Sequence, residues 1–212
     1  MTSEIPVLRY TLGERILHWV AALAYLYVLL TGLAFWSTKL FWIADALGGG
    51  PVVRAWHPWA GLLFVCSVLW MWKEWRRDMR TTAADKTWRS QIRRYVRNED
   101  EHLPPIGRFN FGQKQFFWIM FWAGILLLLS GMVMWFTEYV PWNWRLLRQG
   151  SVLVHAIAFL FTVAAFIVHI YMGTAVVRGG FTSIIRGEVS RPWAKTHHAL
   201  WYADVMENEP KQ

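Results

Sequence analysis

Four long stretches without a charged side chain constrain this protein more than any other feature. Residues 16–36, 55–72, 116–136 and 151–177 contain no Asp, Glu, Lys or Arg. A helix of about 20 apolar residues is long enough to cross the hydrocarbon core of a bilayer. These stretches predict four transmembrane helices, over about 16–36, 53–73, 116–136 and 151–177. We therefore expect an all-α integral membrane four-helix bundle that forms a single domain over residues 1–212.

The composition agrees with a membrane protein and argues against several other classes. Hydrophobic residues make up 55% of the sequence, and there are 16 Trp, which is more than soluble domains usually carry. The single cysteine, Cys66, lies within an apolar stretch, so we expect no cysteine-ligated iron–sulfur cluster and no disulfide framework. The net charge of +8 comes from basic residues between the apolar stretches, which argues against nucleic-acid binding.

The basic residues are distributed unevenly between the two sides of the membrane. Of the 22 Lys and Arg residues, two precede the first span, eleven lie in residues 73–114 and five follow the fourth span, whereas the two other loops hold two each. Because Lys and Arg gather on the cytoplasmic side, both termini are predicted to be cytoplasmic. The cytoplasmic segments are then 1–15, 74–115 and 178–212.

The longest of these loops contains the stretch KTWRSQIRRYVRN (86–98), in which apolar residues recur at helical spacing. This pattern predicts an amphipathic cytoplasmic helix between the second and third spans. A basic face held near anionic lipid and a partner-binding site are both compatible with it.

Four histidines lie at the ends of the predicted spans. His155 and His169 are 14 residues apart in the fourth span, so in a helix they lie about 21 Å apart along the axis and within about 40° of one another around it. His18 begins the first span on the cytoplasmic side, and His57 begins the second on the outer side. The depths therefore match in two pairs, His18 with His169 and His57 with His155.

Two facing histidines at each of two depths are the ligand set that two bis-histidine hemes require. Neutral imidazoles bind iron without leaving a charge in lipid, and a hexacoordinate heme transfers electrons rather than binding oxygen. Gly32, 14 residues after His18, and Gly61, one turn after His57, are candidates to give clearance for a flat ring. Small residues also allow close helix packing. A proton-coupled transporter is the main alternative function.

The segment GRFNFGQKQ (107–115) lies at the cytoplasmic start of the third span. A helix start presents unpaired backbone N–H groups. Asn110, the Gly112 backbone and Gln113 are therefore candidate donors to a quinone carbonyl, with His169 near enough to link quinone and inner heme through water. Asn110 is also placed as an N-cap that accepts from the N–H of Gly112 or Gln113, and both interpretations are kept.

Other polar residues on the cytoplasmic side receive a simpler interpretation. The acidic residues 99–101 are placed to pass protons from the cytoplasm, although a solvated turn is the expectation for them. His102, His197 and His198 lie in cytoplasmic segments, where we expect solvated surface positions.

Five motifs give the chain a specific resemblance to a known family. RYTLGERILHW (9–19), HPWAGLLF (57–64), GRFNFGQKQFFW (107–118), HIYMG (169–173) and RPWAKTHHALWY (191–202) resemble the gamma subunit of respiratory formate dehydrogenases, the membrane cytochrome b of b556 type. The resemblance covers almost the whole chain, in order and with similar spacing. Related diheme cytochromes b of hydrogenases and thiosulfate reductases share the four histidines, but four spans and 212 residues fit formate dehydrogenase better.

The resemblance implies a complete electron-transfer circuit in the bacterial inner membrane. In that family a periplasmic alpha subunit with a molybdenum or tungsten pterin oxidises formate, and an iron–sulfur beta subunit with one transmembrane helix relays the electrons. The gamma subunit passes them through two hemes b to menaquinone or ubiquinone on the cytoplasmic side. The chain is then expected to be the quinone-reducing subunit of an anaerobic respiratory enzyme, with no formate-oxidising centre and no catalytic residue of its own.

The resemblance also implies roles for individual residues and surfaces. It assigns four heme-iron ligands, namely His18, His57, His155 and His169. It assigns a quinone pocket beside the inner heme, formed by Asn110, Gly112, Gln113 and His169. The outer loops are expected to dock on the iron–sulfur subunit, and the tail 191–202 either to meet the cytoplasmic end of that subunit's helix or to cover the inner heme. A higher oligomer of heterotrimers, surrounded by lipid, is the implied assembly.

Overall fold

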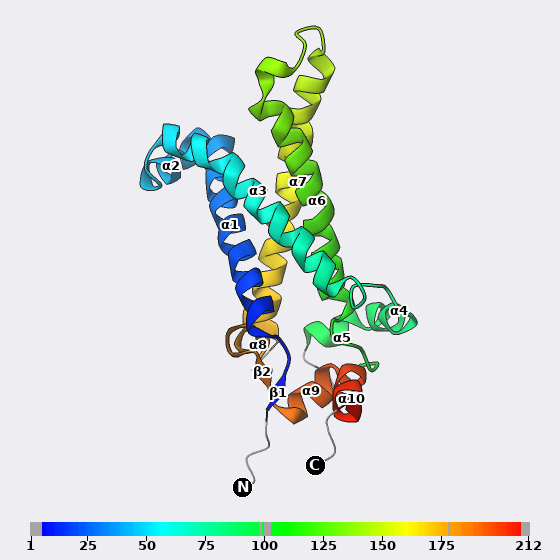
Figure 1. The fold of residues 1–212 in the computed structure, drawn as a ribbon. Coiled ribbons are helices and arrows are strands. Elements are labelled where there is room, and N and C mark those ends of the chain that lie inside the picture. Colours follow the sequence, from blue (N-terminus) through cyan, green and yellow to red (C-terminus); the bar gives the residue numbers. More distant parts are fainter. Residues whose placement is uncertain (1–5, 98, 100–102, 178, 209–212) are drawn as a thin grey trace. The chain divides into compact units, whose positions relative to one another are not determined.

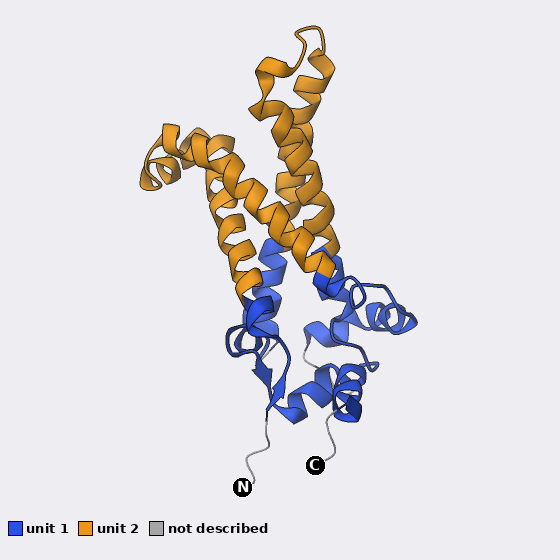
Figure 2. Cartoon of the chain, viewed as in Figure 1, with its two compact units in different colours: residues 1–15, 74–117, 166–212 blue, residues 16–73, 118–165 orange. Residues whose placement is uncertain are grey.

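The computed structural model describes residues 6–97, 99, 103–177 and 179–208, and the chain divides into two compact units (Figures 1 and 2). Unit 1 comprises residues 1–15, 74–117 and 166–212, and unit 2 comprises residues 16–73 and 118–165. The boundaries between the units fall within four long helices, α1 (Leu12–Trp36), α3 (Gly50–Trp75), α6 (Phe111–Trp135) and α7 (Arg145–Tyr171). These helices, with α7 continued by the π-helical turn η4 (Met172–Val176), are long and apolar enough to cross a membrane.

Unit 2 consists of two helical hairpins. A 3-10 turn η1 (Thr38–Leu40) and the short helix α2 (Trp42–Ala46) connect α1 to α3, and the 3-10 turn η3 (Thr137–Tyr139) lies between α6 and α7. Gly48 and Gly49 have φ angles of +102° and +96°, which glycine adopts without steric strain, and they turn the chain into α3. A buried cluster closes this connection, formed by Ala34, Ile43, Ala44 and Val53.

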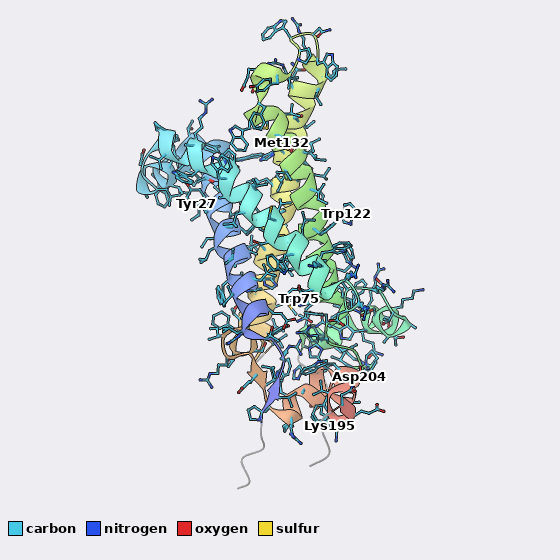
Figure 3. The ribbon with its side chains drawn as sticks, viewed as in Figure 1. Tyr27, Trp75, Trp122, Met132, Lys195 and Asp204 are labelled. Carbon is cyan, nitrogen blue, oxygen red and sulfur yellow. The ribbon has the colours of Figure 1, made fainter. Side chains whose placement is uncertain are left out.

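Aromatic rings and a glycine contribute to the contacts between the helices of unit 2. The rings of Tyr25 in α1 and Phe64 in α3 are 5.3 Å apart, and Gly124 in α6 lies against the same Phe64 ring. Large apolar side chains also face outward along α6, where Trp122 is 59% exposed and Met132 is 47% exposed (Figure 3). A helix that is apolar around its circumference is typical of a membrane span.

Unit 1 joins the two ends of the chain. Strand β1 (Val7–Leu8) pairs antiparallel with β2 (Glu188–Val189), with Val7 opposite Val189. Between η4 and β2 lies α8 (Gly180–Arg186), which ends at Gly187 with φ of +87°. A Cβ on Gly187 would lie 2.7 Å from the carbonyl oxygen of Tyr10. Glycine is therefore required there, both for the left-handed conformation and for the close approach of the two segments.

The tail packs on the N-terminal segment within this unit. Helices α9 (Arg191–His197) and α10 (Ala199–Asn208) follow β2. Their apolar side chains join the strands in one buried cluster, which consists of Val7, Val189, Ala194 and Trp201.

The stretch predicted as one amphipathic helix over 86–98 forms two short helices, α4 (Ala83–Ser90) and α5 (Ile92–Val96). The chain turns at Gln91, whose φ and ψ are −109° and 13°, and residue 98 lies outside the described residues. Trp88 is 1% exposed, whereas Ile92 and Val96 are 43% and 47% exposed. Because the chain turns at Gln91, these residues do not form one apolar face. Trp88 packs near Phe111 at the start of α6, whereas Ile92 and Val96 stay on the surface.

Candidate heme and quinone sites

His57 of α3 and His155 of α7 face each other in unit 2. The centroids of their imidazole rings are 6.4 Å apart, and the ring planes make an angle of 53°. Two imidazoles that bind one iron from opposite sides, with metal–nitrogen bonds of about 2.0 Å, have centroids roughly 6.3 Å apart. The separation of the two rings therefore fits a bis-histidine heme iron.

A hydroxyl group contacts each of these two rings. Thr31 Oγ1 of α1 lies 2.6 Å from Nδ1 of His57, and Ser130 Oγ of α6 lies 3.0 Å from Nδ1 of His155. A Cβ on Gly131 would lie 3.3 Å from Cε1 of His155. Because Nδ1 is engaged in both rings, Nε2 is the nitrogen that each ring offers to a metal. All four long helices thus contribute to this site, although the sequence pattern had singled out only its two histidines.

The two glycines predicted to give clearance for the hemes have different surroundings. A Cβ on Gly32 would lie 3.1 Å from the Phe159 ring. In the structure, this glycine therefore permits close packing of α1 against α7. A Cβ on Gly61 would meet only Val28, at 4.0 Å. Clearance for a porphyrin stays a prediction at both positions, and at Gly32 it requires the Phe159 ring to move.

The predicted inner ligands lie in different units. His18 is part of α1 in unit 2, whereas His169 is part of α7 in unit 1, so their pairing stays a prediction. The His169 ring stacks on Phe116 of α6, with centroids 4.1 Å apart and an interplanar angle of 5°. Because Phe116 is six residues after Asn110, His169 packs against the first turns of the helix that carries the candidate quinone residues.

Asn110 is the N-cap of α6, in the arrangement that the sequence had offered as an alternative to a binding role. Its Oδ1 accepts a hydrogen bond from the backbone N–H of Gln113 at 2.9 Å, and its own N–H donates to Oε1 of Gln113 at 2.9 Å. Its Nδ2 donates to the Tyr95 hydroxyl at 3.0 Å. A Cβ on Gly112 would lie 3.8 Å from the Trp88 ring. A quinone role for these residues stays a prediction, since the geometry by itself is that of a cap.

A buried ion pair fixes α4 to the first turn of α6. Lys114 Nζ lies 2.7 Å from Asp85 Oδ2, with side chains 6% and 2% exposed, and it also donates to the Arg80 carbonyl at 2.9 Å. Asp85 is at the same time the capping-box partner of Thr82. The two residues are 29 positions apart in the chain, and no sequence pattern indicates that they meet. Trp88 and Tyr95, which also contact the start of α6, are among the regularly spaced apolar and aromatic residues of the 86–98 stretch.

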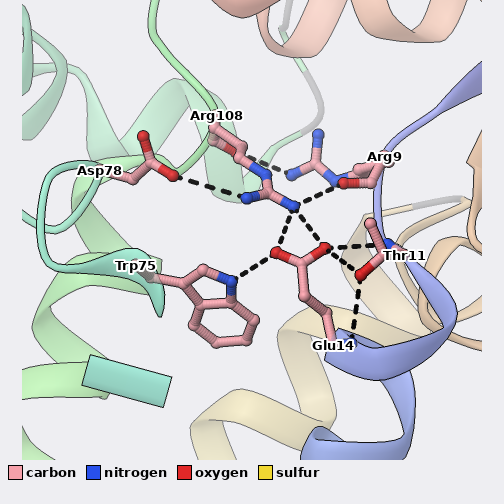
Figure 4. A network of polar contacts seen from close by, with 6 residues as sticks. All are labelled: Arg9, Thr11, Glu14, Trp75, Asp78 and Arg108. Carbon is pink, nitrogen blue, oxygen red and sulfur yellow. Dashed lines mark hydrogen bonds and ion pairs between the residues drawn. The ribbon is translucent and has the colours of Figure 1, made fainter. Parts of the chain in front are cut away.

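Arg108 ties the segment that enters α6 to two other parts of unit 1 (Figure 4). Its Nη2 lies 2.7 Å from Oε1 of Glu14 in α1 and donates to the Arg9 carbonyl at 2.8 Å. Its Nη1 lies 3.5 Å from Asp78, and Trp75 Nε1 donates to the same Glu14 carboxylate at 2.6 Å. The start of α6 is thereby fixed to the start of α1 and the end of α3.

His198 is buried, so the expectation of a solvated position was wrong. It is 3% exposed, with Nδ1 2.7 Å from the Gly107 carbonyl oxygen and Nε2 2.9 Å from Nη2 of Arg9. Burial, together with the nearby Arg9 charge, lowers the pKa of His198 well below its usual value. The error arose because Arg9 and His198 are 189 residues apart, and no local pattern indicates that they meet.

The other cytoplasmic residues give a mixed result. His197 is half-buried, and its ring stacks on Trp193 with centroids 4.6 Å apart, so it too is more than a solvated surface residue. Glu99 is exposed, as expected for a solvated turn. His102 and the acidic residues 100–101 lie outside the described residues.

Comparison with known proteins gives matches along nearly the whole chain. Residues 9–187 match the family described as prokaryotic cytochrome b561. The cytochrome b556(fdo) subunit of formate dehydrogenase from Escherichia coli K12 is 30% identical over 213 residues, which cover 100% of this chain and 99% of the relative. The cytochrome b556(Fdn) subunit of the nitrate-inducible formate dehydrogenase from the same strain is 28% identical, over 100% and 97%. The cytochrome b556 subunit from Haemophilus influenzae is 27% identical, over 97% and 86%.

These matches agree with the four apolar helices of a multi-pass membrane protein. Membership of a cytochrome b family also makes heme b the cofactor, which the facing imidazoles of His57 and His155 are suited to hold. The chain belongs to the prokaryotic cytochrome b561 family and, within it, to the cytochrome b556 subunits of formate dehydrogenase.

Proposed function

We propose that this subunit receives electrons from an iron–sulfur partner on the outer side of the bacterial inner membrane and delivers them to a quinone on the cytoplasmic side. The observation that carries the proposal is the facing pair of His57 and His155, whose ring separation of 6.4 Å fits one iron between them. The relatives named above are cytochrome b556 subunits of formate dehydrogenase, which supports formate as the source of the electrons.

The four histidines have parallel roles in this proposal. His57 and His155 hold the outer heme b, and His18 and His169 hold the inner one. When bound, the two groups supply one-electron redox centres at two depths in the membrane. Two imidazoles would hold each iron, which would favour electron transfer over oxygen binding.

The quinone site that we propose lies where the first turn of α6 meets His169. Three groups would donate hydrogen bonds to a quinone carbonyl there, namely the Asn110 amide, the Gly112 backbone N–H and the Gln113 side chain. The stacking of His169 on Phe116 supports this location, because it brings an inner ligand next to the same helix. Menaquinone and ubiquinone share the carbonyl groups that such donors recognise. The cytoplasmic loops, with exposed Glu99, give protons access to this end.

The charge distribution supports the orientation that we propose. Eighteen of the 22 Lys and Arg residues lie in the segments on the side of both termini, and four lie in the two other loops. The outer pair of histidines is then on the periplasmic side, where the electrons arrive. Each electron that crosses inward against a potential of 100 mV stores about 2.3 kcal/mol, and uptake of protons from the cytoplasm maintains the charge separation.

The chain depends on partners for the rest of the reaction. It holds one cysteine and so cannot supply the ligands of an iron–sulfur cluster. We infer that the outer loops dock on an iron–sulfur subunit that bears a transmembrane helix, and that this subunit in turn contacts a molybdenum or tungsten subunit that oxidises formate. A higher oligomer of such heterotrimers completes the proposed assembly.

Loss of one outer ligand tests the central part of this proposal. In the purified complex, His57→Ala and His155→Ala should each remove one heme per chain and leave the inner heme spectrum unchanged, because a heme with one axial ligand is held weakly. His197→Ala, on the cytoplasmic side, is the matched control and should retain both hemes. Reduced-minus-oxidised spectra and heme quantitation measure the result. A folded complex that contains no heme, or that keeps both hemes in these variants, would overturn the proposal.

A further inference from the structure

The contact between each outer histidine and a hydroxyl group has a defined direction. Thr31 Oγ1 lies 2.6 Å from His57 Nδ1 and also 2.8 Å from the Tyr27 carbonyl oxygen in its own helix. A carbonyl oxygen only accepts hydrogen bonds. If the single hydroxyl hydrogen is donated to Tyr27, the Thr31 oxygen accepts from the imidazole, and His57 carries its hydrogen on Nδ1.

Ser130 repeats this arrangement on the other side of the pair. Its Oγ lies 2.6 Å from the Leu126 carbonyl oxygen and 3.0 Å from Nδ1 of His155. Both histidines therefore have hydrogen-bond acceptors at Nδ1, and the lone pair of each neutral ring lies on Nε2.

Burial makes these contacts specific. Thr31 is 0% exposed and Ser130 is 6% exposed, so water does not readily replace either hydroxyl. Thr31 comes from α1 and Ser130 from α6, whereas the histidines come from α3 and α7. Each ring is thus oriented by a helix other than its own, and the two hydroxyl contacts set the rotation of both rings toward the space between them.

We propose that Thr31 and Ser130 are positioning residues that fix the Nδ1–H tautomer of His57 and His155 and thereby hold and tune the outer heme. The inference rests on the proposed function, since it requires that this pair binds heme. A hydrogen bond from Nδ1–H increases the basicity of the ligating nitrogen. It therefore stabilises the ferric state and lowers the midpoint potential of the outer centre relative to the same site without the hydroxyl.

The chain contains a hydroxyl residue that serves as a matched control. Ser67 of α3 is 5% exposed, and its Oγ donates to the Leu63 carbonyl at 2.8 Å. It resembles Ser130 in burial and in bonding to its own helix, but it makes no hydrogen bond to an imidazole of the described residues. Ser67→Ala therefore removes a buried hydroxyl without altering a heme ligand.

The experiment compares Thr31→Val, Ser130→Ala and their double variant with Ser67→Ala in the purified complex. Thr31→Val keeps the shape of the side chain, and Thr31→Ser keeps the hydroxyl and should behave as the native protein. We expect heme loss from the outer site to apomyoglobin to become about 10- to 100-fold faster, as for other lost ligand partners. We also expect a higher midpoint potential for the outer heme in a redox titration. The inner heme should keep its potential.

The outcomes separate this inference from the proposed function. If His57→Ala removes the outer heme while Thr31→Val and Ser130→Ala leave its potential and loss rate unchanged, the hydroxyls only satisfy their own helices and the inference is wrong. If His57→Ala and His155→Ala leave both hemes in place, the proposed ligand pair itself is wrong. Equal changes in Ser67→Ala would indicate general loosening of the bundle and would also overturn the inference.

Discussion

At the level of single residues, His198 and Arg9 share a buried site in which only the arginine is charged. The Arg9 side chain is 3% exposed, and its guanidinium lies 5.0 to 5.3 Å from the centroids of three aromatic rings, those of Tyr10, Trp193 and Trp201. A guanidinium only donates, so the His198 Nε2 that it contacts accepts, while Nδ1 donates to a carbonyl. A second proton on His198 would turn Nε2 into a donor that faces the N–H groups of Arg9, and it would place a second positive charge beside the guanidinium.

We therefore expect the packing of α9 and α10 to weaken as the pH falls below about 6.5. The pKa of His198 is lowered in the folded state, so the unfolded chain binds this proton first. The contribution of neutral His198 to the free energy of unfolding is fully present at pH values above the pKa that His198 has in the unfolded chain. As the pH falls further, this free energy decreases by about 1.4 kcal/mol for each pH unit in which only the unfolded chain is protonated at His198. Amide hydrogen exchange of residues 191–208, corrected for its intrinsic pH dependence, measures the effect.

The control for this pH effect is His198→Gln, which keeps a donor and an acceptor but does not titrate. Its tail should retain more protection at acid pH, relative to its own protection at neutral pH, than the native tail does. Equal acid weakening in the two proteins would show that another group is responsible.

His57 and His155 could be singled out from the sequence as candidate ligands, whereas the hydroxyl groups that contact them could not. Ionisable residues stand out in an uncharged stretch, and spacing along one helix gives their depth. Serine and threonine are ordinary in such helices, because their hydroxyls bond to the preceding turn, as Thr31 and Ser130 also do. Their contacts with His57 and His155 depend on the rotation of neighbouring helices, which a single sequence does not encode locally.

At the level of elements, apolar length predicted the four long helices, but polar caps determine where they begin. Each helix starts three to six residues before the predicted span. At α1, Thr11 and Glu14 form a reciprocal cap, with the Thr11 N–H donating to Glu14 at 2.8 Å and Thr11 Oγ1 accepting from the Glu14 N–H at 3.3 Å. Capping continues a helix beyond its apolar part at little cost. The division of the 86–98 stretch was missed because helical spacing alone does not locate a turn.

The cap of α6 gives a prediction that separates its two possible roles. Asn110→Asp keeps an oxygen for the Gln113 N–H but loses the amide hydrogens, and the Tyr95 hydroxyl then becomes the donor in their contact. If Asn110 donates to quinone, this variant should keep both hemes and α6 intact while quinone reduction and inhibitor affinity fall. Quinol formation by the complex and inhibitor titration of the heme spectrum are the measurements.

Asn110→Ala provides the comparison, since it removes the cap as well and should destabilise the start of α6 by about 1 kcal/mol. Unchanged quinone reduction and inhibitor binding in Asn110→Asp would leave Asn110 as a cap only. The quinone site would then have to be sought among other residues near His169.

At the level of the whole molecule, orientation in the membrane decides what the proposed electron transfer would accomplish. The basic residues favour the side that carries both termini by eighteen to four. In the function that we propose, that orientation lets the outer pair of histidines receive electrons from the periplasm, and quinone reduction then consumes protons from the cytoplasm. With the opposite orientation the same ligands would move electrons outward, and the membrane potential would favour that movement instead of opposing it.

The topology can be tested through the single cysteine of the chain. In a Cys66→Ser background, Glu138→Cys in η3 and Thr196→Cys in α9 introduce thiols at exposed positions of the two predicted sides. We expect a membrane-impermeant maleimide to label position 138 in intact spheroplasts and position 196 only after lysis, because the positive charge bias retains the termini inside. Labelling of position 196 from outside would reverse the predicted direction of electron flow, and labelling of both from outside would contradict the single span that lies between them.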